Sequence, residues 1–309
     1  MRLPTLAISI GDLNGVGIEI ALKAHAEISE ICIPVYCINA KMLQKAVDIL
    51  GVDIPDDFYL FEVEGDFEIK AGELSKASGQ YSYDSFRAGM KLCKIEDADA
   101  LVTLPINKEA WKLAELDFVG HTDVLRKYFK QDAIMMLGCE EMYVALFTEH
   151  IPLKEVASSI EAEKLAKFLL DLHKSIGDKK VAVLGLNPHA GDNGVLGDEE
   201  KEITKAIEIA NELIGKALFT GPIVPDIAFT PHFRKEYNYF VAMYHDQGLA
   251  PLKALYFDES INVSLNLPII RTSVDHGTAF DIAYQGKAQT LSYLNAVKSA
   301  LAFIEAKNV

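Results

Sequence analysis

Short apolar runs rich in β-branched residues alternate along the chain with longer segments whose apolar positions recur every three or four residues. The short runs predict buried strands, because loop-favouring Gly, Asn, Asp or His residues follow them. The expected strands are 5–10, 31–38, 100–104, 143–148, 181–186, 239–244 and 269–273. The expected helices are 17–28, 83–96, 161–176, 199–214 and 292–306. Strands that alternate with helices predict an α/β protein with a mostly parallel sheet.

The length of the chain, 309 residues, exceeds the roughly 250–300 residues at which one hydrophobic core stops growing. We therefore expect two domains or one large α/β unit. No internal repeat and no low-complexity linker marks a boundary. The pattern alone therefore does not place the division between domains.

The charge of the chain argues against a nucleic-acid partner. The sequence has 45 acidic and 30 basic residues, a formal net charge of −15, and no Lys/Arg run that could follow a phosphate backbone. No apolar run approaches the length of a membrane span, so no span is expected. An anionic substrate would need positive groups concentrated locally in its site.

Four cysteines, at positions 32, 37, 93 and 139, show neither the spacing of a metal-thiolate site nor a dense disulfide framework. The first apolar stretch reaches Gly11 and Asp12 too early for a secretory signal peptide. Both features favour a reducing, cytoplasmic location.

Three histidines follow expected strands: His150 after 143–148, His189 after 181–186 and His245 after 239–244. The carboxyl ends of parallel strands form the edge at which α/β proteins bind ligands. Neutral imidazole is a common ligand of divalent cations, and three of them leave coordination positions open for a substrate. The sequence therefore suggests a catalytic metal site of three histidines. The alternative is that each is a loop histidine bonded to the backbone.

The other regions are less specific. His25, His173 and His232 fall on expected helix faces or in a polar loop, where structural or exposed roles are the expectation. The glycine-rich turn Gly11–Gly17 precedes a helix, and such a turn can accept an anion. A tight turn that simply needs glycine is the default explanation.

Four motifs identify a resemblance. They are GHTD at 120–123, GLNPHAG at 185–191, YHDQG at 244–248 and RTSVDHGTA at 271–279. Together they resemble the signature of the 4-hydroxythreonine-4-phosphate dehydrogenases, enzymes of pyridoxal phosphate biosynthesis. The resemblance runs in order from Ile8 to about Ala288, nearly the whole chain.

This resemblance implies a two-domain, isocitrate/isopropylmalate dehydrogenase-like α/β fold with mostly parallel sheets and a cleft between the domains. The first domain would comprise 1–125 and 271–309, and the second 126–270. The resemblance also implies a divalent metal held by His150, His189 and His245. The third histidine would come from the other subunit of a homodimer, which places the active site at the interface.

The family's substrate contacts match residues that suit an anionic, hydroxylated substrate: His121, Thr122, Lys253, Asn262 and Arg271. Asp226 matches an acidic position near the site. Arginine and lysine suit phosphate or carboxylate groups, and Lys253 is the candidate catalytic proton acceptor, because a bound metal nearby would lower the pKa of a lysine. Read alone, Lys253 and Arg271 could be surface charges, and Asn262 a strand-edge residue.

A second resemblance concerns the cofactor. Residues 276–283 (HGTAFDIA), followed by 286–288 (GKA), look like the adenine-side loop of isocitrate and isopropylmalate dehydrogenases. It implies that His276, Gly277, Thr278, Ala279 and Asp281 bind the cofactor. A carboxylate at Asp281 favours NAD, because it would repel the 2′-phosphate of NADP.

The implied reaction is NAD-dependent oxidation of 4-phosphohydroxy-L-threonine at its C3 hydroxyl, followed by decarboxylation to 3-amino-2-oxopropyl phosphate. The metal could be zinc, cobalt, nickel, magnesium or manganese. Three alternatives are a dehydrogenase of 4-phospho-D-erythronate or threonate, a phosphotransacetylase-like acyltransferase, and a metal-dependent hydrolase or aldolase. Leu13 and Ile18 replace common family prolines, so we expect altered loop stiffness there without loss of activity. Leu104 replaces a usual glycine, which argues against close approach of the backbone to a ligand at that position.

Overall fold

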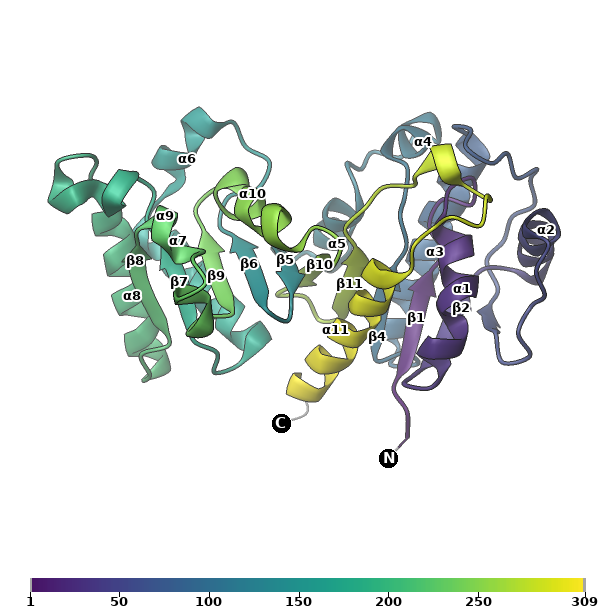
Figure 1. Cartoon of the computed structure of the whole chain (residues 1–309), viewed down its shortest axis with the longest axis horizontal. Coiled ribbons are helices and arrows are strands. Elements are labelled where there is room, and N and C mark those ends of the chain that lie inside the picture. The colour runs from purple at the N-terminus through teal and green to yellow at the C-terminus, as the bar shows by residue number, and fades with distance from the viewer. Residues whose placement is uncertain (1, 308–309) are drawn as a thin grey trace. The chain divides into compact units, whose positions relative to one another are not determined.

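Buried apolar strands form the centres of two α/β units in the computed structural model, which describes residues 2–307 (Figure 1). The first unit contains the chain up to Gln131 together with the residues from Leu267 onward. The second unit is Asp132–Asn266. The first unit is therefore built from both ends of the chain and the second from its middle.

The first unit has a parallel arrangement of strands in the order β3-β2-β1-β4-β11. Their bounds are β1 Thr5–Ser9, β2 Ile33–Cys37, β3 Tyr59–Phe61, β4 Ala100–Thr103 and β11 Ile270–Val274. Every residue of β1 and β4 is buried. Burial on both faces explains why these strands read as continuous apolar runs.

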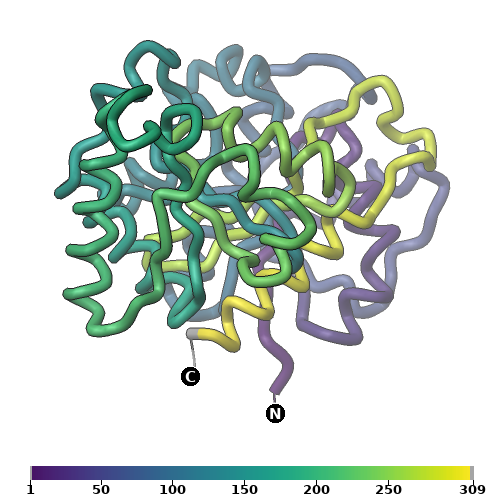
Figure 2. Tube along the Cα trace, turned by 60° about the vertical axis from the view of Figure 1, so that its left-hand side comes forward, coloured from purple at the N-terminus to yellow at the C-terminus, as the bar shows by residue number. Residues whose placement is uncertain are grey.

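Helices cover both faces of these strands. They are α1 Gly17–Ser29, α2 Ala40–Leu50, α3 Lys76–Lys94, α4 Lys108–Leu113, α5 His121–Phe129 and α11 Leu291–Lys307, with a short turn η3 Phe280–Ile282. Gly89 of α3 lies against Leu101 of β4. On the neighbouring strand β11, the hydroxyl of Thr272 donates to the carbonyl of Ala296 in α11. Thr272 is paired in register with Val102, the residue after Leu101. Because neighbouring strand residues point to opposite faces, α3 and α11 cover opposite faces. Helix α11 also packs beside α1 (Figures 1 and 2).

The second unit has strands in the order β10-β5-β6-β9-β7-β8. Their bounds are β5 Ile134–Cys139, β6 Met142–Leu146, β7 Val181–Leu184, β8 Phe219–Ile223, β9 Tyr239–Ala242 and β10 Ile261–Leu265. Strand β5 is antiparallel to both of its neighbours, and β6, β9, β7 and β8 run parallel. The mostly parallel α/β class expected from the sequence is confirmed.

The helices of the second unit are α6 Leu153–Ser159, α7 Ala162–Ile176, α8 Glu199–Ile214, α9 Pro225–Ala228 and α10 His245–Tyr256, with η1 Pro188–Gly194 and η2 Phe233–Lys235. Leu249 and Leu252 of α10 pack on alternate residues of the strands, such as Val144 and Ala242. Helix α7 packs against α8. The beginning of α10 is thereby held directly above β6 and β9.

The seven strands and five helices expected from the sequence are all present, with bounds that differ by a few residues except at the start of α3. Helix α3 begins at Lys76, where Ser75 accepts a hydrogen bond from the amide of Ser78. Its first turns are polar, so the apolar pattern predicted only the later part. Strands β3, β5, β8 and β10 and helices α2, α4, α5, α6, α9 and α10 were not predicted.

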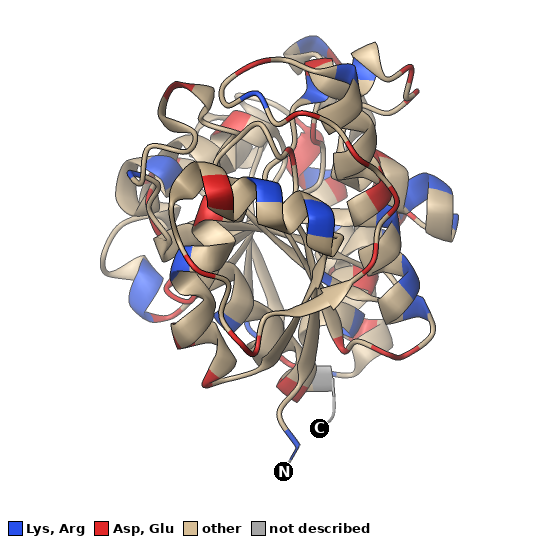
Figure 3. Cartoon of the chain, turned by 90° about the vertical axis from the view of Figure 1, so that its right-hand side faces the viewer, with Lys and Arg blue, Asp and Glu red and all other residues tan. Residues whose placement is uncertain are grey.

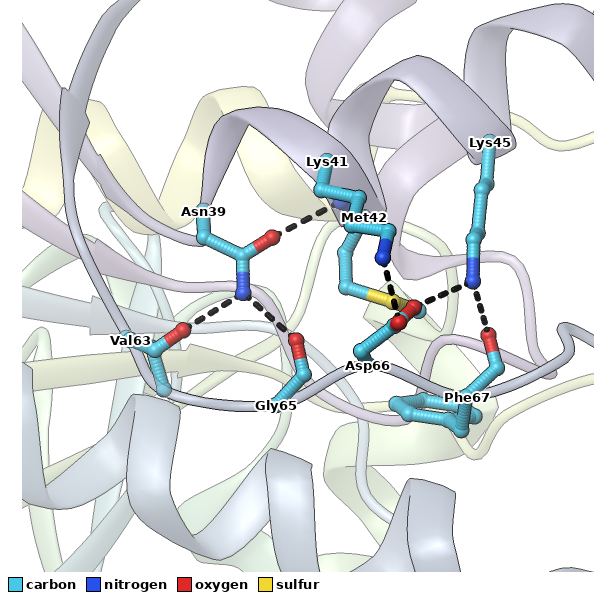
Figure 4. A network of polar contacts seen from close by, with 8 residues as sticks. All are labelled: Asn39, Lys41, Met42, Lys45, Val63, Gly65, Asp66 and Phe67. Carbon is cyan, nitrogen blue, oxygen red and sulfur yellow. Dashed lines mark hydrogen bonds and ion pairs between the residues drawn. The ribbon is translucent and has the colours of Figure 1, made fainter.

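Helix α2 begins at a side-chain cap that also ties down the segment after β3 (Figure 4). The side-chain oxygen Oδ1 of Asn39 accepts from the backbone amide of Met42 at 2.8 Å, and its side-chain nitrogen Nδ2 donates to the carbonyls of Val63 and Gly65. Lys41 and Lys45 both contact Asp66. Asn39, Lys41, Val63 and Gly65 border a cavity of about 300 Å³, and none of the expected site residues lines it.

Charges of both signs are interspersed on the helices and loops of the face drawn in Figure 3. The four cysteines are buried and free of disulfides. None of the helices in the described part of the chain combines the length and the apolar character that crossing a bilayer requires.

Candidate functional site

The three histidine turns of the second unit lie at one edge of its strands. Strands β6, β9 and β7 are neighbours and run parallel, with β9 between the other two. His150 follows β6 by four residues, His189 follows β7 by five and His245 follows β9 by three. The turn of His245, the first residue of α10, is therefore the central one.

Buried polar side chains tie these three turns together. The hydroxyl of Thr148, in the β6 turn, donates to the carbonyl of Met243 in the β9 turn at 2.6 Å. The side chain of Gln247 accepts from the amide of Met243 at 2.7 Å and donates to the carbonyl of Gly185 in the β7 turn at 2.6 Å. One hydrogen-bonded network thus fixes the three turns relative to one another.

His150 and His245 lie close together, with ring centroids 5.4 Å apart. Two imidazoles that share a tetrahedral ion at roughly 2.1 Å would have centroids about 5 Å apart. Nδ1 of His245 lies 2.7 Å from a carboxylate oxygen of Asp246. A neutral His245 that donates its Nδ1 proton to Asp246 presents the Nε2 lone pair, an arrangement typical of metal-ligating histidines.

His189 lies on an exposed turn with unusual backbone geometry. Residues 189–193 all have positive φ, a left-handed conformation that costs energy at non-glycine positions. Glu200 supports this turn, because its carboxylate accepts from the amides of Leu186 and Asn187 and from the side chain of Asn187. Within the described residues of this single chain, no three His, Cys, Asp or Glu side chains meet as a metal site. The chain therefore joins His150 to His245 and leaves His189 outside that pair.

In the first unit, Arg271 and His121 form a buried pair. One nitrogen of the guanidinium, Nη2, donates to Oγ1 of Thr103 at 2.6 Å and lies 3.0 Å from Nδ1 of His121. Because arginine can only donate, Nδ1 of His121 must accept, and the imidazole proton sits on Nε2. Nε2 is buried and has no hydrogen-bond partner in the described part of the chain. It is a donor that an anionic or hydroxyl group of a substrate could satisfy.

The surroundings of His121 favour its neutral form. Its ring packs edge-on against Phe86 and Trp111. Burial, and then the positive charges of Arg271 and Lys108, hold the pKa of His121 well below its ordinary value. Burial also lowers the pKa of Arg271 to about 9, so this group remains a cation at neutral pH.

Helix α5 adds to the positive character of this site. It begins at His121 after Gly120, and no side chain caps its first amides. Thr122 lies in this first turn. Free amides at a helix start attract anions, because the helix dipole is positive there.

The remaining expected substrate residues lie on three separate elements of the second unit. Lys253 is in α10, about 12 Å along the helix axis from His245 at 1.5 Å per residue. Asn262 is in β10, paired with Leu137 of β5. Asp226 is an exposed residue of α9.

The loop with the expected cofactor residues follows β11. His276 and Gly277 are exposed, Thr278 is buried, and Ala279 has a φ of 43°. Asp281 is exposed in η3, and its backbone carbonyl accepts from the side chain of Gln285. The carboxylate of Asp281 therefore faces solvent.

The glycine-rich turn before α1 is a packed turn, and the amide of Val16 already donates to the carbonyl of Thr278 at 3.0 Å. Gly11 has a φ of +72°, and a Cβ there would lie 2.3 Å from the carbonyl oxygen of Pro105. This close approach and the positive φ support the tight-turn explanation. Leu104 is fully buried behind it.

The other histidines have structural or exposed settings. His25 is buried and contacts the hydroxyl of Tyr36 and the carboxylate of Asp57. Four further residues contribute to the site and were not predicted from the sequence: Thr103, Lys108, Glu200 and Gln247. Each of them is a polar residue at the end of a strand or near the start of a helix, which is a common place for site residues. Their partners are distant in sequence, so the sequence does not show what they contact.

Comparison with known proteins gives concordant matches. A family model described as "Pyridoxal phosphate biosynthetic protein PdxA" matches residues 30–300. A 4-hydroxythreonine-4-phosphate dehydrogenase of Sulfurimonas denitrificans is 66% identical over 97% of this chain and 98% of its own. The crystal structure of a 4-hydroxythreonine-4-phosphate dehydrogenase from Burkholderia phymatum is 32% identical, with a TM-score of 0.82 over 98% of this chain and 99% of that one.

A more distant structure has a different title. A terephthalate 1,2-cis-dihydrodiol dehydrogenase from Burkholderia xenovorans is 25% identical, with a TM-score of 0.70 over 97% of this chain and 98% of that one. Proteins with this fold thus include a dehydrogenase with another substrate.

Proposed function

The chain belongs to the PdxA family of pyridoxal phosphate biosynthetic proteins, and on this basis we propose that it oxidises 4-phosphohydroxy-L-threonine at the C3 hydroxyl. The oxidised acid then loses CO2 to give 3-amino-2-oxopropyl phosphate. The observation that carries this proposal is the 66% identity, over 97% of the chain, to a protein named 4-hydroxythreonine-4-phosphate dehydrogenase. The buried pair of Arg271 and His121 supports it, because it presents a cation and a donor suited to an anionic substrate.

A dehydrogenase of this family uses a nicotinamide cofactor, and we propose NAD. The cofactor supplies the acceptor of the hydride that leaves C3. His276, Gly277, Thr278 and Ala279 would line its adenosine half. The exposed carboxylate of Asp281 would bond the ribose hydroxyls and repel a 2′-phosphate.

We propose that His150, His189 and His245 hold a divalent cation. The contact of His245 with Asp246 fits such a role, because it leaves Nε2 of His245 available as a ligand. When bound, the ion would acidify the substrate hydroxyl and stabilise negative charge during loss of CO2. Nitrogen ligands suit zinc, cobalt and nickel, and magnesium or manganese can also serve.

The chain's own residues would bind and orient the substrate. His121, Thr122 and Arg271 would hold one anionic group through a neutral N–H donor, helix amides and a cation. Lys253 would accept the hydroxyl proton, and Asn262 and Asp226 would contact the rest of the substrate. We also propose a cytoplasmic homodimer in which each site takes the third metal ligand, the histidine at position 245, from the other subunit.

The test is an assay of NADH formation by the purified protein. We expect turnover with 4-phosphohydroxy-L-threonine and NAD, and at least about tenfold lower kcat/KM with NADP or with 4-phospho-D-erythronate, a difference of about 1.4 kcal/mol. Preference for phospho-erythronate or threonate would identify the alternative dehydrogenase. Acetyl transfer to coenzyme A without NADH formation would contradict a dehydrogenase altogether.

A further inference from the structure

Glu19, a buried acid in the first turn of α1, grips a segment far away in sequence. It is 2% exposed, and its two carboxylate oxygens accept from the amides of Ala288, at 2.8 Å, and Gly286, at 3.3 Å. Its other contact is with Lys23, one helical turn later, at 3.0 Å. A buried carboxylate with three donors is held in one conformation.

Lys23, on the same face of α1, binds the same two residues as Glu19. Its ammonium group donates to the carbonyls of Gly286, at 2.6 Å, and Ala288, at 3.1 Å. The pair therefore bonds both the amide and the carbonyl of each of these two residues. Such matched contacts fix the path of the backbone, since a shift of one residue would break all four bonds.

The same loop is anchored to the turn before α1 at two earlier points. The carbonyl of Thr278 accepts from the amide of Val16 at 3.0 Å, and the hydroxyl of Tyr284 donates to the carbonyl of Leu13 at 2.7 Å. A Cβ at Gly15 would lie 2.8 Å from the carbonyl oxygen of Thr278. Figure 2 shows the yellow C-terminal loop beside the purple N-terminal turn.

Loop 276–288 depends on these anchors for its shape. Ala279 and Tyr284 have φ values of 43° and 60°, in the left-handed region that side chains other than glycine rarely adopt. Asp281 lies between the anchored points and is exposed. Its carboxylate is therefore placed by the anchors around it and not by packing of its own side chain.

We propose that Glu19 and Lys23 are positioning residues for the dinucleotide: they hold loop 276–288 in the shape that presents Asp281 to the adenosine ribose. This inference rests on the proposed function, because it takes the loop as the cofactor loop. The N-terminal turn and α1 would form the surface against which the loop packs. Neither residue needs to touch the cofactor.

The variants are Glu19→Gln, which keeps the size of the side chain, and Lys23→Met, which removes the charge at a partly exposed position. Lys23→Arg serves as the conservative rescue. The matched control is Lys298→Met, which breaks an exposed ion pair between α11 and Glu27 of α1. Asp281→Ala tests the cofactor loop itself.

The first readout is amide hydrogen exchange in the protein without cofactor. We expect Glu19→Gln and Lys23→Met to speed exchange at Gly286 and Ala288 by at least about tenfold, because local opening becomes easier. The second readout is the NAD dissociation constant from calorimetric titration. It should rise at least about tenfold, while kcat at saturating NAD and the KM of the phosphorylated substrate change less than about twofold.

The outcomes separate the two proposals. If Asp281→Ala weakens NAD binding but Glu19→Gln and Lys23→Met leave both exchange and NAD affinity at the level of the Lys298→Met control, the positioning role is wrong and the proposed function stands. If Asp281→Ala leaves NAD binding unchanged, the loop is not the cofactor loop and the positioning role fails with that assignment, whereas the NADH-formation assay tests the proposed function separately. Faster exchange and weaker NAD binding in both variants, with recovery in Lys23→Arg, support the inference.

Discussion

Nη2 of Arg271 lies 3.0 Å from Nδ1 of His121, and this contact determines which imidazole nitrogen carries the proton. The arginine can only donate, so the histidine accepts at Nδ1 and holds its proton at Nε2. A buried donor that has no partner among the described residues and a buried cation are thus placed side by side. From this arrangement we predict effects on substrate binding and on the protonation of His121.

Replacing Arg271 with lysine should weaken substrate binding although the charge is retained. One guanidinium nitrogen, Nη2, contacts both Thr103 and His121, and the compact ammonium group of lysine lacks the planar guanidinium geometry that suits a phosphate or carboxylate group. We expect kcat/KM for the phosphorylated substrate to fall about 100-fold, the cost of one or two charge-assisted hydrogen bonds. Steady-state kinetics check this, with Arg87→Lys on the exposed face of α3 as the control. Equal kcat/KM for Arg271→Lys and the control would refute the role.

Nuclear magnetic resonance of the ring nitrogens should find His121 neutral at pH 6.5, with its proton on Nε2. Burial and the charges of Arg271 and Lys108 hold its pKa well below the ordinary value, at which a free histidine would be half protonated. Lys108→Met removes one of these charges and should raise the pKa of His121. A Lys112→Met variant in the same helix is the control. A half-protonated His121 near pH 6.5 in the native protein would contradict this account.

The free energy of unfolding should depend on pH because His121 is neutral in the folded protein. In the unfolded chain His121 takes up a proton below its ordinary pKa of about 6.5, whereas in the folded chain it does so only at lower pH. The unfolded state then binds more protons, so stability falls as the pH drops below about 6.5, by up to about 1.4 kcal/mol per pH unit for this group. Denaturant titrations of the native chain and of His121→Gln should diverge only below that pH. Parallel curves down to pH 5 would mean that His121 titrates normally.

Gln247→Leu should destabilise the second unit and separate its histidine turns. The substitution removes the side-chain partners of the Met243 amide and the Gly185 carbonyl, both in buried turns. Two unsatisfied buried groups cost about 2–4 kcal/mol. Denaturant unfolding measures this loss, with Gln44→Leu on the exposed face of α2 as the control. A loss no larger than that of the control would show that the network does not hold the turns.

The strands that lead into the three histidine turns could be predicted from the sequence, because β6, β7 and β9 are buried runs with clear ends. Their spatial order could not be predicted, since β9 comes last along the chain yet lies between the other two. Helix α10 contains Gly248 and Pro251, which read as loop residues. Strand β10 contains Asn262 and Ser264 and lacks a continuous apolar pattern.

Site residues that belong to sequence motifs could be predicted. Residues that act by hydrogen bonding to the backbone of distant segments could not. The motif histidines and Arg271 stand at recognisable positions. Gln247 and Glu200 act on carbonyls and amides of other turns, and the sequence contains no sign of which turns will meet. Glu19 has the same character, because its partners are 267 and 269 residues away.

The central claim is that His150, His189 and His245 bind one divalent cation on which turnover depends. The most direct measurement is calorimetric titration of zinc into the chelator-treated protein, for the native chain and for each His→Ala variant. The account predicts one ion per site in the native protein and at least about 100-fold weaker binding in each of the three variants, including His189→Ala, since each removes one of three ligands. Native zinc affinity in His189→Ala, or in any of the three, would contradict it.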